Sequence, residues 1–140
     1  PAAGRGPGTL PVRGPAGALA VCRFDRSDGP VRVAGSTPDG FMSVAFHTTR
    51  GGVFYAVTDR SATRGVLDIL LLTPEQLEEV QSEDPEDEPV RELRIVAPEM
   101  TGIVSLRALA IEPSQMADAE EALKRVRCGP EDRDEKALAP

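Results

Sequence analysis

Chemically specialised side chains are scarce in this 140-residue sequence, and each scarcity argues against a class of function. There is no Trp, aromatic residues make up 4% of the chain, and His47 is the only histidine. No glycine-rich loop follows a strand pattern and opens a helix, so nucleotide binding has no support. The Gly-x-Ser-x-Gly motif of the α/β hydrolases is also missing. Finally, no apolar run is long enough to span a bilayer.

Positive charge is in short supply as well. The chain has 16 Lys and Arg residues against 23 Asp and Glu residues, which gives a formal net charge of -7. Nucleic acids and anionic lipid surfaces are bound through clustered cations, so we expect neither as a partner. The acidic run 83–88 lacks the glycine-shaped curvature of a calcium loop, and prolines interrupt it. We therefore expect no metal and no cofactor.

The two cysteines, Cys22 and Cys128, lie near the two ends of the patterned region. A redox pair is usually Cys-x-x-Cys with one thiol at a helix N-terminus. Cys128 instead follows a predicted helix at its C-terminal end, where the helix dipole does not favour a thiolate. We expect a structural disulfide that joins the start of the domain to its end. Such a bond indicates an oxidising compartment, periplasmic or otherwise extracytoplasmic.

Strand patterns dominate from Gly17 onward. The predicted strands are 19–24, 31–33, 41–48, 53–58, 66–72, 90–97 and 103–111. The Asp-Gly-Pro turn at 28–30 predicts a hairpin between the first two strands, and 53–58 is expected to pair back on 41–48. The strand 66–72 is almost wholly apolar, which predicts a central strand buried on both faces.

Two helices are predicted. Thr73 is a capping residue, Pro74 suits the first helical position and Glu75 favours the positive end of the dipole, so a short helix starts here and ends near Val80. A second helix is predicted over 114–127, where apolar residues recur at three and four positions. The fold class is therefore mainly β with flanking helices (α+β). We expect an antiparallel β-sandwich-like domain with a short helix after strand five and a C-terminal helix.

One domain is expected, over residues 17–128. Residues 1–16 are rich in Gly, Pro and Ala without periodicity, which predicts a flexible leader. Residues 129–140 are charged and show no periodic pattern, which predicts a disordered tail. Because the chain starts at Pro1 without Met, we expect that a signal or anchor segment has been removed.

The order of strands and turns resembles a known family. The strings "CRFDRSDGPVRV", "GFMSVAFHTTRGGVFYAVTDRSA", "GVLDILLLTPEQ" and "TGIVSLRALAIEPS" resemble the DUF1254 family of bacterial envelope proteins, most closely its short, single-domain branch. The resemblance covers residues 18–128, with Thr58 where the family pattern has Asn. It implies a transmembrane helix followed by a periplasmic domain tethered to the inner membrane. It implies no activity and no catalytic residue.

Polar residues around the fourth strand are the candidate site. Arg60 with Arg50 and Arg64 would make an anion-binding patch, because guanidinium groups donate paired hydrogen bonds to carboxylate or phosphate. In the alternative reading, Asp59 caps its turn and Arg60 pairs locally. A lone histidine at a strand end, such as His47, more often makes a hydrogen bond than takes part in catalysis. The possible ligand-binding residues are His47, Arg50, Tyr55, Asp59 and Arg60.

Three functions remain open. The leading hypothesis is a non-enzymatic domain of the cell envelope that binds or packs against another envelope component, protein or glycan. The alternative is a small-ligand-binding or hydrolytic domain whose site is built around His47, Tyr55, Asp59 and Arg60. That alternative requires these side chains to converge on one pocket. The third is a structural spacer in a larger complex.

Overall fold

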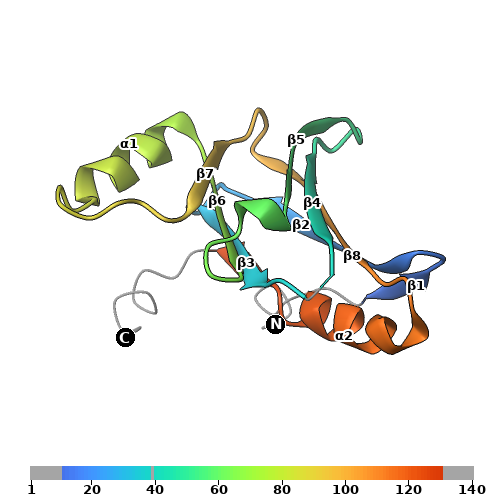
Figure 1. The fold of residues 1–140 in the computed structure, drawn as a ribbon. Coiled ribbons are helices and arrows are strands. Elements are labelled where there is room, and N and C mark those ends of the chain that lie inside the picture. Colours follow the sequence, from blue (N-terminus) through green and yellow to red (C-terminus); the bar gives the residue numbers. More distant parts are fainter. Residues whose placement is uncertain (1–10, 39, 131–140) are drawn as a thin grey trace.

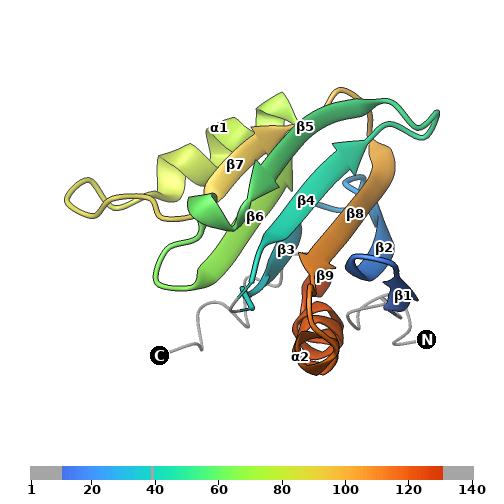
Figure 2. The same ribbon diagram turned by 45° about the vertical axis from the view of Figure 1, so that its right-hand side comes forward.

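The computed structural model describes residues 11–38 and 40–130, which form two β-sheets and two helices (Figures 1 and 2). The five-stranded sheet has the order β1-β2-β8-β4-β5, and the four-stranded sheet has the order β7-β6-β3-β9. Only the β6–β7 pair is parallel among the described strands. The predicted mainly β, sandwich-like fold is confirmed. The strands are β1 (Val12–Gly14), β2 (Gly17–Asp25), β3 (Val31–Ser36), β4 (Met42–His47), β5 (Val53–Thr58), β6 (Val66–Leu72), β7 (Leu93–Val96), β8 (Thr101–Leu109) and β9 (Arg127–Pro130).

The long strands β2 and β8 show how the core is built. Both alternate strictly between buried and less buried residues, because successive side chains of a strand point to opposite faces. Their antiparallel register sets Cys22 opposite Val104 and Ala20 opposite Leu106, so the buried sets share one face. In the other sheet, Leu70 and Leu72 of β6 are fully buried on the face away from the main core. The predicted burial of this strand on both faces is confirmed.

Helix α1 (Pro74–Glu83) covers the outer face of the four-stranded sheet by packing Leu77 and Val80 on β6. It starts with a capping box: the Thr73 hydroxyl accepts from the Gln76 N–H at 3.1 Å, and the Gln76 side chain accepts from the Thr73 N–H at 2.9 Å. The helix continues past the predicted end at Val80. It stops where Asp84 is extended, since Asp84 precedes a proline.

Loss of this cap is expected to weaken the domain modestly. Thr73→Ala removes the acceptor of the Gln76 N–H, which costs about 1 kcal/mol of the free energy of unfolding. Urea denaturation followed by circular dichroism measures it. The control is Thr49→Ala, an exposed threonine in the β4–β5 turn, which should change the free energy by less than about 0.5 kcal/mol. Equal effects of the two substitutions would contradict the assigned cap.

The C-terminal helix α2 (Pro113–Lys124) is shorter than predicted, and the chain then forms strand β9. Val126 and Cys128 are buried and alternate with exposed Arg125 and Arg127, which is a strand period. The prediction that Cys128 ends a helix is therefore wrong. Pro130, assigned to the tail, also belongs to β9, and β1 lies within the predicted leader. The remaining residues of both segments, 1–10 and 131–140, lie outside the described residues.

The predicted hairpin between the first two strands is also wrong, because β2 and β3 belong to different sheets. The loop between them is held by Arg26, which is buried and donates to the carbonyls of Leu72 and Glu99. Burial lowers the pKa of this guanidinium. In return the Arg26 carbonyl accepts from Gln76 at 2.9 Å, so the loop is tied to the start of α1. A turn pattern shows that the chain reverses, but it does not show which sheet comes next.

Cys22 and Cys128 form the predicted disulfide, with Cα atoms 6.7 Å apart. Cys22 belongs to β2 of the larger sheet and Cys128 to β9 at the edge of the smaller sheet. The bond therefore joins the two layers of the sandwich. Disulfides persist in oxidising environments, so the bond indicates an extracytoplasmic location.

Candidate functional site on the outer face of the five-stranded sheet

The five-stranded sheet turns one face away from the core, and the helices lie elsewhere. Helix α1 packs on the other sheet and α2 lies at one end of the sandwich (Figure 2). Strand register places the side chains of this face in rows. One row runs Val21–Ser105–Ala45–Ala56, and the next runs Arg23–Ile103–His47–Val53. We call the residues of these two rows, with Arg107, the outer face.

His47 and Ser105 form a hydrogen-bonded pair on the outer face. The His47 Nε2 atom lies 2.9 Å from the Ser105 Oγ, and its Nδ1 atom lies 3.2 Å from the carbonyl oxygen of Gly51. A carbonyl can only accept, so Nδ1 carries a proton and donates to Gly51. In the neutral ring Nε2 is then the acceptor for the Ser105 hydroxyl.

The β4–β5 turn positions the Gly51 carbonyl beside the imidazole. The Thr48 N–H donates to the Gly52 carbonyl at 2.9 Å, and the Gly51 N–H donates to the Thr48 carbonyl at 2.9 Å, which closes a tight turn. Gly51 has a φ of 100°, a backbone conformation that residues with a Cβ atom rarely adopt. The register also shifts between Phe46 and His47, as in a β-bulge. Bulges re-aim side chains, and here the shift sets the direction of His47.

Two arginines flank the pair. Arg23 is opposite Ile103, which is itself opposite His47, and Arg107 follows Ser105 by two residues on the same face of β8. Both are exposed. Within the described residues, neither guanidinium has a hydrogen bond or an ion pair with another side chain. The outer face therefore presents positive charge around a serine–histidine pair, in a chain that is acidic overall.

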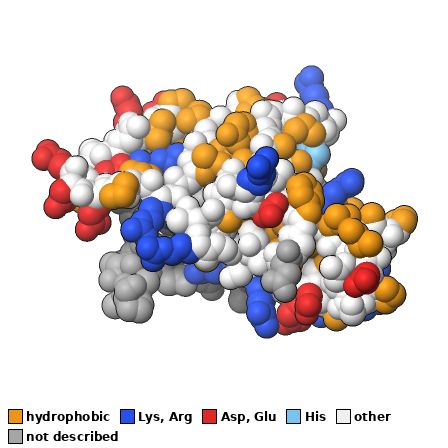
Figure 3. Space-filling view, in the orientation of Figure 1, with side chains coloured by type: hydrophobic (Ala, Val, Ile, Leu, Met, Phe, Trp, Pro, Cys, Tyr) orange, Lys and Arg blue, Asp and Glu red, His pale blue; other side chains and the backbone are white. Residues whose placement is uncertain are grey.

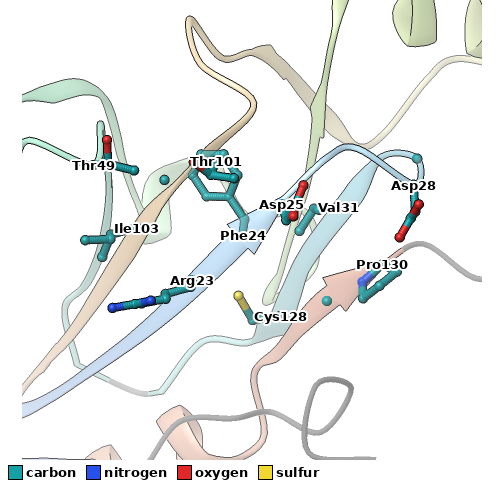
Figure 4. A pocket seen from close by; sticks show the side chains of 13 residues that line it. Arg23, Phe24, Asp25, Asp28, Val31, Thr49, Thr101, Ile103, Cys128 and Pro130 are labelled. Carbon is teal, nitrogen blue, oxygen red and sulfur yellow. The ribbon is translucent and has the colours of Figure 1, made fainter.

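A cleft of about 600 Å³ lies at the end of the sandwich and is lined by residues of β2 and β8 from one sheet and of β3 and β9 from the other (Figure 4). Arg23 and Ile103 belong both to the cleft and to the row of His47, and Thr49 follows His47 by two residues. Asp25 lines the cleft too, and the Ser27 N–H that it accepts at 2.9 Å lowers the pKa of its carboxyl group. The lining residues are Arg23, Phe24, Asp25, Asp28, Gly29, Val31, Thr49, Thr101, Gly102, Ile103, Cys128, Gly129 and Pro130.

The residues that we predicted from the sequence to form one site do not lie together in the structure. His47 and Arg50 lie at the β4–β5 turn, whereas Asp59 and Arg60 lie in the 3-10 helix η2 (Asp59–Ser61) beyond the far end of β5. The length of β5 separates these pairs by about 17 Å, at about 3.3 Å per residue. Tyr55 lies between them on the edge strand.

The local contacts of η2 also differ from the sequence-based alternative. The cap of this turn is Thr58, whose hydroxyl accepts from the Arg60 N–H at 3.3 Å. The Oδ1 atom of Asp59 is buried and has no hydrogen-bond partner among the described residues. Asp59 therefore does not cap its own turn.

Ser105, Arg23 and Arg107 were missed by the sequence reading. The alternation of residues 103–109 places Ser105 on the polar face of its strand, but its partner His47 lies 58 positions earlier in the chain. Among the described residues, no helix is long and apolar enough to cross a membrane. No group of three or more His, Cys, Asp or Glu residues able to hold a metal occurs in 11–38 and 40–130.

Comparison with known proteins gives a likeness of fold alone. No family model and no curated protein matches the sequence. The VPA0106 protein from Vibrio parahaemolyticus is similar in structure, with a TM-score of 0.64 and 12% identity over 98% of this chain. An uncharacterized protein from Burkholderia cenocepacia is similar with a TM-score of 0.52 and 12% identity over 86% of this chain. The present chain spans 32% and 31% of those two chains, respectively.

Proposed function

We propose that this chain is a periplasmic domain of a membrane-anchored bacterial envelope protein related to the DUF1254 family, and that it binds a partner protein through its outer face. Three observations support the proposal. The Cys22–Cys128 bond suits an oxidising compartment. Two bacterial proteins share the fold. The motifs of residues 18–128 resemble the family.

The composition of the outer face carries the binding part of the proposal. Val21 is 48% exposed and Val53 is 59% exposed on a sheet face that no described helix covers, and Val21 is close to Arg23 and Arg107 in the strand register. Protein interfaces are enriched in arginine and depleted in lysine, and the outer face carries Arg23 and Arg107 and no lysine. The largest group of acidic side chains in Figure 3 lies at the end that carries α1, and a smaller group lies near α2. The partner that this charge distribution fits is a protein surface that presents carboxylates.

Site-specific crosslinking in the envelope tests the proposal. A photo-reactive residue at Val21 should capture a protein partner, whereas one at Glu78, exposed on α1, should not. Arg107→Glu should weaken capture about tenfold, which corresponds to about 1.4 kcal/mol. Arg125→Glu is the matched control, because Arg125 follows the end of α2, is exposed and is not part of the outer face, so capture should be unchanged.

Two outcomes would contradict the proposed function. Equal capture at Val21 and Glu78 would mean that the outer face is not a specific interface. A captured species that glycosidases remove would replace the protein partner by a glycan. Correct folding of each variant is checked by its melting temperature, so that a loss of capture is not caused by unfolding.

A further inference from the structure

The structure assigns a second role to the outer face: we infer that Ser105 is a nucleophile for acyl transfer, with His47 as its general base and esters of anionic carboxylic acids as its substrate class. This inference goes beyond partner binding and does not depend on it. From the sequence we expected a non-enzymatic domain, because it contains no recognisable catalytic motif. The contact of Ser105 with His47 rests on the pairing of β4 with β8.

The arrangement of the two side chains meets the first requirement for nucleophilic catalysis. A serine hydroxyl is a weak nucleophile until a neighbouring base accepts its proton. The Ser105 Oγ lies 2.9 Å from the unprotonated Nε2 of His47, which is within the range for proton transfer. The Gly51 carbonyl, 3.2 Å from Nδ1, holds the imidazole in the tautomer that leaves Nε2 free to accept.

There is room for a substrate above the hydroxyl. Ser105 is opposite Val21 on one side and Ala45 on the other, and Ala45 is opposite Ala56. Small side chains therefore form a shallow floor beside the nucleophile.

Arg23 explains the preference for an anionic acid part. It lines the cleft, and its strand position is diagonal to Ser105, within reach of a long side chain. A guanidinium donates paired hydrogen bonds to a carboxylate, so Arg23 holds the free carboxylate of a half-ester such as a succinate monoester. Arg107 follows Ser105 by two residues on the same face of β8, so its guanidinium is close enough to stabilise the negative charge that develops on the carbonyl oxygen.

The proposed reaction is a two-step ester hydrolysis. The Ser105 Oγ attacks the carbonyl carbon while its proton passes to the Nε2 of His47. The bond to the alcohol oxygen then breaks, and the alcohol leaves with the proton from His47. Water, deprotonated by His47, next attacks the acyl-serine. The carboxylic acid is released, and the proton returns from His47 to Ser105, so no oxidant, reductant or metal is consumed.

A covalent serine probe tests the nucleophile directly. The whole chain is incubated with a fluorophosphonate, and adducts are counted by intact-mass spectrometry and located by peptide mapping. The wild type should gain one adduct at Ser105, and Ser105→Ala should gain none. The matched control is Ser43→Ala, which removes a serine from the same face of β4 and should label like the wild type. Equal labelling of wild type and Ser105→Ala, or an adduct at another residue, would overturn the inference.

Two further measurements separate catalysis from a structural role of the pair. His47→Gln should slow labelling about a hundredfold with the melting temperature nearly unchanged. Arg23→Gln should raise KM for p-nitrophenyl succinate at least tenfold. In a Ser105→Cys variant, the thiol should react with iodoacetamide at least tenfold faster than in Ser105→Cys combined with His47→Gln. Equal rates in that pair would show that His47 activates nothing and would overturn the inference, whether or not the partner of the outer face has been found.

Discussion

Reduction of the Cys22–Cys128 disulfide is expected to lower the melting temperature of the domain by about 12–25 °C. The bond links residues 106 positions apart, and the chain-entropy model gives about 4–5 kcal/mol for a loop of that size. For a domain of this length, each kcal/mol corresponds to about 3–5 °C. Differential scanning calorimetry with and without a phosphine reductant measures the shift.

The position of the bond makes the effect global. Cys128 lies in β9, a four-residue edge strand that pairs only with β3 among the described strands. Cys22 lies in β2, whose pairing with β1 ends at Leu19. Once the bond is broken, the edges of the two layers are held together by packing alone.

A double variant is the control for this prediction. Cys22→Ala with Cys128→Ala should melt near the temperature of the reduced wild type, and the reductant should not shift it further. A shift of less than about 2 °C on reduction of the wild type would show that the disulfide does not constrain folding.

The substitution Phe46→Ala is expected to cost about 3–5 kcal/mol of the free energy of unfolding. Phe46 is completely buried in the main core, and its ring centroid lies 6.2 Å from that of Phe54. In β4 it is opposite Val104 of β8 on one side and Tyr55 of β5 on the other. Removal of the ring leaves a cavity at the strand pairing that brings His47 to Ser105, so the reactivity of Ser105 should fall as well.

Phe41→Ala provides the comparison. Phe41 is 46% exposed just before β4, and its removal should cost less than about 1 kcal/mol. Guanidinium denaturation of both variants gives the two values. If the two substitutions had similar effects, β4 would not have the burial assigned to it.

The strands and the disulfide were predictable because they depend on local patterns and on cysteine content. The alternation in residues 19–24 and the apolar run 66–72 each indicate a strand without any knowledge of its neighbours. The partner of each strand is different, since it depends on contacts between distant residues. For this reason the turn after β2 suggested a hairpin, whereas the buried contacts of Arg26 direct the chain into the other sheet.

The sequence around residues 124–128 contains both a helical pattern and a strand pattern. Lys124, Arg125 and Arg127 favoured a helix that continues to its dipole-matched end. The alternation of buried Val126 and Cys128 with exposed arginines was the weaker signal, yet it decides the structure because β9 completes the four-stranded sheet. A helix-stop pattern such as Gly129-Pro130 is equally compatible with an edge strand, where proline is tolerated.

Only part of the candidate site could be predicted from the sequence. His47 was identified because it is the only histidine, and histidine is a frequent general acid or base in active sites. Ser105 gave no such signal, since serines are common on exposed strand faces. Asp59 and Arg60 were grouped with His47 because they are close in sequence, but the intervening strand β5 separates them in space.

The most direct test of the proposed periplasmic location is to trap the thiols of the protein in the cells that make it. Cells are quenched in acid, and the protein is alkylated with a maleimide before and after reduction and then weighed intact. We predict no maleimide on Cys22 or Cys128 before reduction and one on each afterwards. Alkylation of both thiols before reduction would place the protein in a reducing compartment and contradict the envelope location.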